Sequence, residues 1–480
     1  GIACGVLDLN LPCLLAQFEH EIEANDRWSK RASRDRQKNV TQLRLPGLYR
    51  SFDRYQRAVR DLGRVLDLAG RKNGCKITLA NYDDSARTPL RSSDLLASAE
   101  EFETNHFHSC FKPLLEEALA AHQVEYVGLS LSYLSQALTG FAVAGFIRHH
   151  FPEIKIIAGG GLITSWMSSP AWKNPFRGLI DHCLAGCGED QLLELFGSGS
   201  RPGLGRFSYK DLSLADYLAP GGVLPYAASH GCYWQKCQFC PDFAEGSCYE
   251  TKPAREAVAE INQLIHMHKP VLVHLLDNAI SPALLKQLAE NRLKIPWYGF
   301  ARFEKELEDF DFCVALRRAG CVMLKLGLES GSAKVLEQLN KGIDLGRASR
   351  ILDNLQRAGI GAYVYLLFGT PAETESEALL TLEFVRTHWQ AITYLNLAIF
   401  NMPVCSPEAA DLKNRFSEGD LSLYCDFVHP RGWDRKAVRS FLQKRFRKDP
   451  LVRKIELRSP GVFGSNHAPF LLASPHSFHF

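Results

Sequence analysis

Short apolar runs alternate with segments of helical period along the first half of the chain, beginning near residue 75. The predicted strands are 75–80, 125–131, 154–158 and 178–184, and the predicted helices are 107–122, 138–150 and 189–196. Strands that alternate with helices are typical of right-handed β–α–β units around a parallel sheet. We therefore expect a doubly wound, Rossmann-like α/β domain over roughly residues 70–198, which binds ligands at the carboxyl ends of its strands.

A second alternation begins at residue 223 and ends near residue 400. Its predicted strands are 223–228, 271–276, 297–301, 322–328, 362–368 and 392–399, and its predicted helices are 253–267, 282–291, 305–318, 333–339, 345–358 and 375–388. Six β/α units in series indicate a partial (β/α)6 barrel of the TIM type, in which chemistry takes place at the carboxyl ends of the strands.

Four domains or segments follow from these two patterns. They are an N-terminal extension with the first α/β domain (1–198), a linker (199–222), the partial barrel (223–400) and a short C-terminal cap (401–480). The cap shows no clear alternation and is expected to close the barrel mouth. The polar, basic run 25–38 has no apolar period, so we expect a solvated helix or loop there.

Charge and hydropathy argue against several classes of protein. The 480 residues include 56 Lys and Arg against 53 Asp and Glu, and this net charge of +3 is too small for a nucleic-acid-binding footprint. The chain has no run of about 18 apolar residues that would predict a transmembrane helix, and its first residues lack the pattern of a signal peptide. We therefore expect a cytoplasmic protein with neither nucleic acid nor a membrane as a partner.

Fourteen cysteines are unusual for such a protein, and their spacing separates three of them from the rest. Cys232, Cys237 and Cys240 lie within nine residues, just after the first predicted barrel strand. Three thiolates on a loop at the reactive end of a barrel indicate a metal site. Two occupants are open: zinc, with Cys248 as the fourth ligand, or a 4Fe–4S cluster with one free iron. Most other cysteines are scattered and fit buried packing.

Residues 225–403 resemble the radical SAM (S-adenosylmethionine) superfamily, first of all through the cysteine loop Cys232-x4-Cys237-Gln-Phe239-Cys240. The commonest loop of that family has three residues between its first two cysteines, whereas this one has four. The resemblance implies that the three cysteines hold a 4Fe–4S cluster, that Phe239 belongs to the cofactor site, and that the open iron chelates SAM. One electron then cleaves SAM to methionine and a 5′-deoxyadenosyl radical, which abstracts a hydrogen atom.

Later strand ends resemble the SAM-binding segments of the same family. By this resemblance Asp277 contacts the SAM amino group and Arg302 the SAM carboxylate. Glu329 and Ser330 stand in Leu-Gly-Leu-Glu-Ser-Gly-Ser, which is similar to the fourth-strand signature whose acid bonds the SAM ribose, and Gly369 stands in the segment near adenine. Ordinary alternatives stay open: helix capping for Asp277 and Glu329, a solvent ion pair for Arg302, and a plain strand-to-helix turn for Gly369.

The first α/β domain resembles the cobalamin-binding domain that precedes many radical SAM barrels. Ser132 and Leu134 match its Ser-x-Leu motif, and Gly159 and Gly160 match its Gly-Gly motif, followed by Cys-Gly-Glu-Asp at 187–190. The resemblance implies that these residues line the nucleotide tail of cobalamin, and small residues suit a tail that approaches the backbone. An ordinary strand-to-helix turn is the alternative. The family's Asp-x-His-x-x-Gly motif is absent, so no histidine is assigned as an axial ligand of cobalt.

The leading hypothesis is a cobalamin-dependent radical SAM enzyme that methylates an unactivated carbon. A second is a radical SAM enzyme that performs a ring closure, rearrangement or oxidation, with the cobalamin-type domain as a scaffold. The non-enzymatic alternative is a zinc or iron–sulfur protein that binds a partner. The expected partners are a small-molecule or peptide substrate and an electron donor such as flavodoxin or ferredoxin. Tyr363, Tyr365 and Trp433 are candidates for lining a pocket, with core packing as the alternative.

Overall fold

The computed structural model describes residues 3–19, 22–121, 123–199, 204–412, 414–415, 418–460 and 467–473. Its largest feature is a sheet of six parallel strands whose spatial order follows their order in the chain. The strands are β6 (Val223–Tyr226), β9 (Leu272–Leu275), β10 (Trp297–Ala301), β11 (Cys321–Glu329), β12 (Gly361–Phe368) and β13 (Ile392–Ile399). The six strands predicted for the second half of the chain are thereby confirmed.

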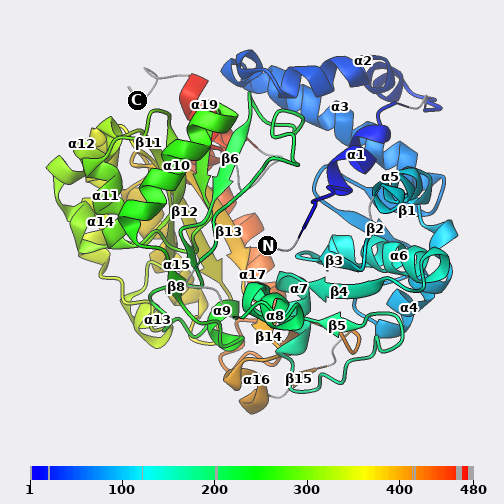
Figure 1. The fold of residues 1–480 in the computed structure, drawn as a ribbon. Helices are drawn as coiled ribbons and strands as arrows, with labels where there is room; N and C mark the ends of the chain where they lie inside the picture. The colour runs from blue at the N-terminus through cyan, green and yellow to red at the C-terminus, as the bar shows by residue number, and fades with distance from the viewer. Residues whose placement is uncertain are drawn as a thin grey trace.

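Helices connect the successive strands of this sheet. They are α10 (Ala254–His268), α11 (Pro282–Glu290), α12 (Phe310–Arg318), α13 (Ala333–Gln338), α14 (Leu345–Ala358) and α15 (Glu375–Thr387). Right-handed crossovers between parallel neighbours place such helices on one face of the sheet, where Figure 1 shows α10, α11, α12 and α14. Leu324, Leu326 and Leu328 of β11 are fully buried in that layer. The residues that alternate with these leucines along the strand, such as Met323 and Lys325, belong to the opposite, inner face.

The first half of the chain contains a smaller parallel sheet. Its strands are β3 (Tyr126–Ser130), β4 (Lys155–Gly159) and β5 (His182–Cys183), in sequence order, and α6 (Leu134–His150), α7 (Gly161–Met167) and α8 (Gly188–Leu195) follow them. The strand predicted at 75–80 does not join this sheet. Instead β1 (Cys75–Ile77) turns back and pairs antiparallel with β2 (Tyr82–Asp84). The Thr78 hydroxyl accepts hydrogen bonds from the amides of Ala80 and Asn81, which closes the turn.

The parallel sheet of this half therefore has three strands, in the part of the chain that the structure describes. Their order does not reverse, whereas reversal is the feature that defines a doubly wound sheet. The prediction was wrong on this point, because one strand was assigned to a segment that forms a hairpin. The helices α4 (Ser92–Glu100) and α5 (His108–Ala120) precede β3 in place of a further β/α unit.

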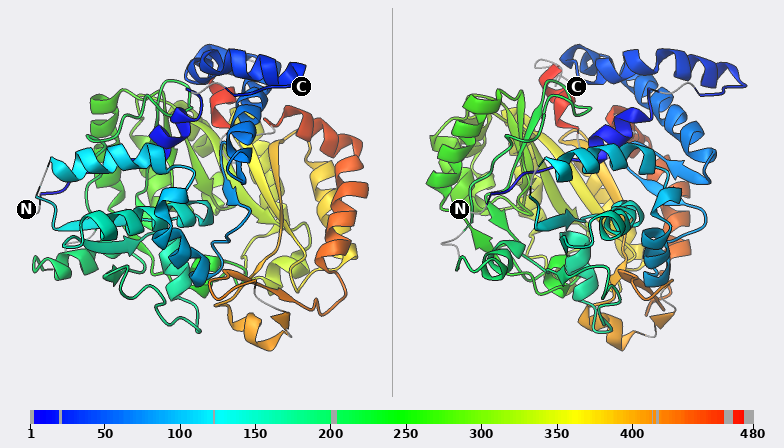
Figure 2. Two further views of the ribbon diagram at one scale, coloured as in Figure 1. Left: turned by 90° about the vertical axis from the view of Figure 1, so that its right-hand side faces the viewer. Right: turned by 45° about the vertical axis from the view of Figure 1, so that its right-hand side comes forward.

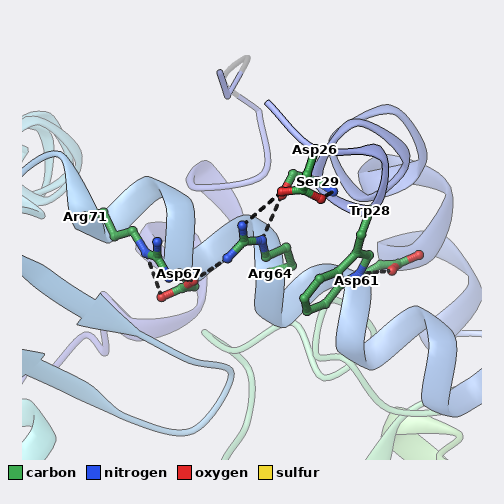
Figure 3. Close-up of polar contacts among 7 residues, drawn as sticks. All are labelled: Asp26, Trp28, Ser29, Asp61, Arg64, Asp67 and Arg71. Carbon is green, nitrogen blue, oxygen red and sulfur yellow. Dashed lines mark hydrogen bonds and ion pairs between the residues drawn. The ribbon is translucent and has the colours of Figure 1, made fainter. Parts of the chain in front are cut away.

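The polar run 25–38 is helical and packs against the protein, which corrects the expectation of a solvated segment. α2 (Arg27–Leu43) lies against α3 (Phe52–Arg71) and buries one side of its surface there. Its charged residues are also paired: the Arg64 guanidinium of α3 donates to the Ser29 hydroxyl at 2.8 Å and pairs with Asp26 at 3.2 Å (Figure 3). The indole of Trp28 donates to Asp61 at 2.8 Å. Ala32, Val40 and Leu43 of α2 are buried in the same apolar cluster as the inner face of α3, so apolar packing holds the helix and the partly exposed polar pairs add little.

The C-terminal residues divide between the two ends of the six-stranded sheet. Near its carboxyl ends lie β14 (Met402–Pro403), α16 (Pro407–Asp411), β15 (Asn414–Arg415) and β16 (Tyr424–Phe427). Two helices, α17 (Arg435–Lys444) and α18 (Pro450–Arg458), then join the core of the sheet. At the amino ends, α19 (Ala468–Ala473) packs Leu471 beside Leu272 and Tyr363, while Phe470 meets Tyr55 at a ring distance of 4.8 Å. The segment predicted as one cap thus covers both ends.

The first half of the chain lies on the inner face of the six-stranded sheet, opposite the helices that cover its other face. Figures 1 and 2 show the residues before 200 on the side away from α10, α11 and α14. None of the helices in the described ranges combines the length and the apolar character needed to cross a bilayer. The arrangement brings the carboxyl edges of both parallel sheets close to one another, as the contacts of the site show.

Candidate cofactor-binding site

The cysteine loop, residues 231–249, leaves the carboxyl end of β6 and lies between two short paired strands. These are β7 (Ser229–His230) and β8 (Glu250–Thr251), which run antiparallel. Cys237 is buried, whereas Cys232 and Cys240 are half-buried. Burial raises the pKa of Cys237, and the nearby Cys232 raises it further. The pKa of Cys240 is raised to about 11, chiefly by burial and to a small extent by Cys237. Cys237 therefore lies close enough to both of the other thiols to influence its own pKa or theirs.

Three hydrogen bonds hold the loop against the edge of the sheet. Asp277, which is 1% exposed, accepts from the Ser229 hydroxyl at 2.6 Å and from the Ala228 amide at 3.2 Å. The Tyr233 hydroxyl donates to Glu304 at 2.8 Å. Burial raises the pKa of Asp277, and the bond from Ser229 opposes that shift. Asp277 thus supports the base of the cysteine loop, and helix capping does not describe its contacts.

Arg302 lies directly behind the loop and is 7% exposed. Its Nε pairs with Glu304 at 3.3 Å, so the ion pair considered for it is present, with a buried guanidinium and a carboxylate that is 24% exposed. Its Nη1 is 4.0 Å from the Cys237 sulfur, and its Nη2 donates to the Lys341 carbonyl at 2.5 Å. The guanidinium also stacks over the Trp234 ring at 4.2 Å, and the Trp234 indole donates to the Asn340 carbonyl at 2.9 Å. The cation is therefore fixed beside a thiol.

Glu329 ends β11 in a left-handed conformation, with φ of +68°, beside an irregularity in the pairing with β12. Its Oε1 accepts from Lys341 Nζ at 2.8 Å, and that ammonium lies 5.3 Å from the Phe239 ring. Helix capping is done by Ser332, whose hydroxyl accepts from the Val335 amide, and not by Glu329. A strained backbone position with a buried ion pair is typical of functional sites.

Lys341 is the residue of this group that the sequence did not suggest. It stands between α13 and α14, where Asn340 and Gly342 both have positive φ. Lys341 and Arg302 each lower the pKa of Cys237 and so partly offset its burial. The only local signal was the Asn-Lys-Gly turn itself, which is a common loop composition.

Ser330 and Gly369 lie in the turns that follow β11 and β12. The Ser330 hydroxyl is fully buried, accepts from the Ser332 amide at 3.1 Å and lies 3.3 Å from the Thr381 hydroxyl. Gly369 has φ of +81°, and its amide donates to Glu373 at 2.6 Å. Both residues therefore shape the sheet edge, and neither is seen here in contact with the cysteine loop.

Glu373 gives a prediction about stability. The side chain is fully buried, and burial raises its pKa from 4.5 to about 7, against the opposing bonds from Gly369 and Trp433. Between these values the unfolded chain has lost the proton that the folded chain keeps, so the free energy of unfolding falls as pH rises. The total fall is about 3 kcal/mol. Urea unfolding at pH 5 and pH 8 should show most of this difference disappearing in Glu373→Gln; an unchanged pH dependence would contradict it.

The three aromatic residues that were candidates for lining a pocket differ in burial. Tyr363 is buried and stacks on His467 at 4.7 Å, and Trp433 is buried and donates to Glu373 at 2.9 Å, so both pack in the core. Tyr365 is half-buried on the inner face of the sheet.

The predicted cobalamin-type residues gather at the carboxyl edge of the small sheet. Ser132 follows β3, and its amide donates to Gln136 at 2.8 Å; Leu134 begins α6. Gly159 ends β4 and accepts from the Leu131 amide at 2.8 Å. A Cβ on Gly160 would lie 2.5 Å from the Leu131 carbonyl oxygen, and its φ is +100°. The backbone of the Gly159-Gly160 motif thus lies directly against Leu131, the residue before the Ser-x-Leu motif.

Replacing Gly160 with alanine is expected to cost about 2–4 kcal/mol, because strained φ and a backbone collision act together. Gly178→Ala is the matched control, since Gly178 has φ of +93° but open space around its Cα. We expect the control to lose only about 1 kcal/mol. Urea unfolding of both variants measures the difference, and equal losses would show that the contact with Leu131 is unimportant.

The two sheet edges are joined by one direct hydrogen bond. The Ser165 hydroxyl of α7 donates to Glu245 at 2.6 Å, and Glu245 follows α9 (Pro241–Ala244), the short helix of the cysteine loop. Burial raises the pKa of Glu245. The edge that carries Gly160 therefore lies against the loop that carries the three cysteines.

The four thiols of the loop differ in exposure: Cys248, the proposed fourth zinc ligand, is exposed, whereas the other three are buried or half-buried. In the described ranges no three His, Cys, Asp or Glu side chains converge as one ion requires, and this includes Cys232, Cys237 and Cys240. Four ligands about 2.0–2.3 Å from the metal would be needed to close a structural zinc site. Three thiols on one loop match the thiolate ligands of a cluster, and Arg302 and Lys341 supply positive charge beside one of them, Cys237.

Comparisons with known proteins were made at the level of sequence and of structure. No family model matches the chain. An uncharacterized methyltransferase of Pyrococcus horikoshii is 25% identical over 191 residues, which make up 37% of this chain and 40% of the relative. The match thus spans less than half of that relative's length.

Two groups of solved structures have a similar fold. TsrM from Kitasatospora setae, a radical S-adenosylmethionine methyltransferase solved with tryptophan and a SAM analogue, has a TM-score of 0.51 at 16% identity, over 69% of this chain and 76% of its own. A second TsrM structure contains cobalamin and a [4Fe–4S] cluster. OxsB, a cobalamin-dependent radical enzyme solved with aqua-cobalamin and SAM, has a TM-score of 0.55 at 14% identity, over 68% and 60%.

These likenesses show that the chain has the fold of cobalamin-dependent radical SAM enzymes. The fold expected from the resemblance is thereby confirmed.

Proposed function

We propose that the protein is a radical SAM enzyme that binds a 4Fe–4S cluster through Cys232, Cys237 and Cys240. The observation that carries the proposal is the position of these thiols, on one loop at the carboxyl edge of a six-stranded parallel sheet, with Arg302 4.0 Å from Cys237. The sheet is interpreted as a partial (β/α)6 barrel, since six β/α units and the TsrM and OxsB folds support that architecture.

The chain's own residues would bind and orient the cofactors. Such a cluster, when bound with one open iron, supplies the electron that cleaves SAM to a 5′-deoxyadenosyl radical. Arg302 and Lys341 hold positive charge beside Cys237, which partly offsets the rise in its pKa on burial and so favours its thiolate form. Glu329, whose Oε1 already accepts from Lys341, offers its second oxygen to the SAM ribose, and Phe239 offers a ring face. Asp277 keeps Ser229 and the base of the loop in place.

We further propose that the first α/β domain binds cobalamin and that the reaction is methylation of an unactivated carbon. Ser132, Leu134, Gly159 and Gly160 would line the nucleotide tail, because they lie at one sheet edge with little side-chain bulk. The hydrogen bond from Ser165 to Glu245 keeps that edge beside the cysteine loop, so that both cofactors can act on one substrate. A small-molecule or peptide substrate and a flavodoxin or ferredoxin as electron donor complete the proposal.

Cobalamin binding and transfer of labelled methyl groups test the methylation proposal. The anaerobically reconstituted 480-residue chain should retain cobalamin through gel filtration and should transfer label from methyl-labelled SAM to an acceptor. The Ser165→Ala variant should retain cobalamin but transfer label more slowly, since it removes the bond between the edges. A protein that retains no cobalamin, and forms 5′-deoxyadenosine without methyl transfer, would leave a ring closure, rearrangement or oxidation instead.

A further inference from the structure

The inner face of the six-stranded sheet carries a buried cation without a carboxylate partner. Lys325, in the middle of β11, is 1% exposed, and its Nζ lies 3.2 Å from Nε2 of His274 on β9. The same ammonium lies 5.1 Å from the Tyr298 ring centre and 4.8 Å from that of Phe300. Among the residues that the structure describes, no acid contacts it. An ammonium in this setting is costly to the fold and is typical of functional sites.

The histidine beside this lysine is fixed and uncharged. Its ring stacks on Tyr298 at 4.2 Å with an angle of 8° between the planes. Burial, together with the charge of Lys325, lowers the pKa of His274 to about 3. Burial also lowers the pKa of Lys325 to about 8, so the ammonium stays mostly protonated at neutral pH. The neutral imidazole accepts one hydrogen bond from a group that has three to donate.

Lys325 stands on the same strand and the same face as the cofactor site. Glu329 comes four residues later, so the two Cα atoms are at most about 13 Å apart. His274, Phe300, Tyr365 and Asn396 around this level are only half-buried, which shows that solvent reaches this part of the inner face.

The inner face is closed at its other end. Met323, two residues before Lys325, packs with Ala468 and Leu471 of α19 in an apolar cluster at the amino ends of the strands. The half-buried residues around Lys325 therefore lie on the cysteine-loop side of this cluster.

We infer that Lys325, oriented by His274, binds a carboxylate group of the substrate. This inference rests on the proposed function, because it places the substrate between the inner face and the cysteine loop. One ammonium matches the single charge of a carboxylate, whereas a phosphate dianion would need further cations that this part of the structure does not contain. The rings of Tyr298 and Phe300 beside the ammonium suit an apolar or aromatic group next to that carboxylate.

Binding of matched acids and amides tests the inference without using turnover. The reconstituted 480-residue chain is titrated with acetate, succinate and 3-phenylpropionate and with their amides, and binding is followed by saturation-transfer NMR. The best carboxylate is expected to bind at least about tenfold more tightly than its amide, the effect of one charge-assisted hydrogen bond. Lys325→Met should remove this preference, while Lys334→Met, at a 59% exposed lysine of α13, should leave it unchanged.

The melting temperature of the variant gives an additional check. The Lys325→Met protein should melt about 2–4 °C higher than the wild type, because the substitution removes an uncompensated buried charge. A wild-type protein that binds acids and amides equally, or a variant that keeps the preference, would overturn the inference. Failure of the proposed function would be seen separately, as absence of 5′-deoxyadenosine from the wild-type protein whatever its preference for carboxylates.

Discussion

Replacing Cys237 with alanine is expected to reduce the formation of 5′-deoxyadenosine from SAM by more than about 100-fold. Loss of even an indirect partner of a metal ligand typically costs 10–100-fold, and Cys237 is proposed as a ligand itself. It is also the most buried of the three thiols and the one beside Arg302. The measurement is iron content and 5′-deoxyadenosine after anaerobic reconstitution of the full chain. Iron should fall together with SAM cleavage.

Cys248→Ala is the matched control for that experiment. Cys248 belongs to the same loop but is exposed, whereas the other three thiols are buried or half-buried. Iron content and SAM cleavage should therefore stay at the wild-type level. If Cys248→Ala lost metal as completely as Cys237→Ala, the loop would be a four-cysteine site, and the zinc alternative would return.

Lys341→Met is expected to have the second-largest effect, and it acts on both stability and reactivity. The substitution leaves Glu329, whose side chain is only 12% exposed, without its partner at 2.8 Å. Removing one partner of a buried ion pair costs about 3–5 kcal/mol. It also removes positive charge beside Cys237, and we expect SAM cleavage to fall by about 10–100-fold. Urea unfolding and 5′-deoxyadenosine formation measure the two effects.

A double variant separates these two roles of Lys341. Glu329→Gln combined with Lys341→Met removes both charges, so most of the lost stability should return. SAM cleavage should stay low, because the cation beside the thiol and the carboxylate for the ribose are both missing. If SAM cleavage recovered together with stability, the pair would serve the fold alone.

The repeated β/α pattern made the six-stranded sheet predictable. Each of its strands is an apolar run followed by a segment of helical period, and the positions 297–301 and 392–399 agree with β10 and β13. The hairpin at Cys75 was not predictable in the same way. Its apolar run resembles a buried strand, and the turn depends on hydroxyl contacts of Thr78 with nearby amides. Local hydrogen bonds of this kind leave little trace in hydropathy.

The candidate site was predictable where the chemistry lies within one motif. Cys232, Cys237 and Cys240 share a loop, so their spacing alone indicated a metal site. Lys341 and Lys325 depend on packing between distant segments. Lys341 reaches Glu329 from a turn twelve residues later, and Lys325 meets His274 from another strand. Nothing in the sequence separates these two lysines from the others. They are distinguished in the structure by their burial, which is rare for lysine side chains.

Reductive cleavage of SAM by the wild-type protein tests the central claim most directly. The full chain is reconstituted anaerobically with iron and sulfide, iron and zinc are counted, and 5′-deoxyadenosine is measured after reduction in the presence of SAM. The account predicts about four irons per chain and 5′-deoxyadenosine that depends on Cys232, Cys237 and Cys240 together. Bound zinc in place of iron, with no 5′-deoxyadenosine, would contradict it.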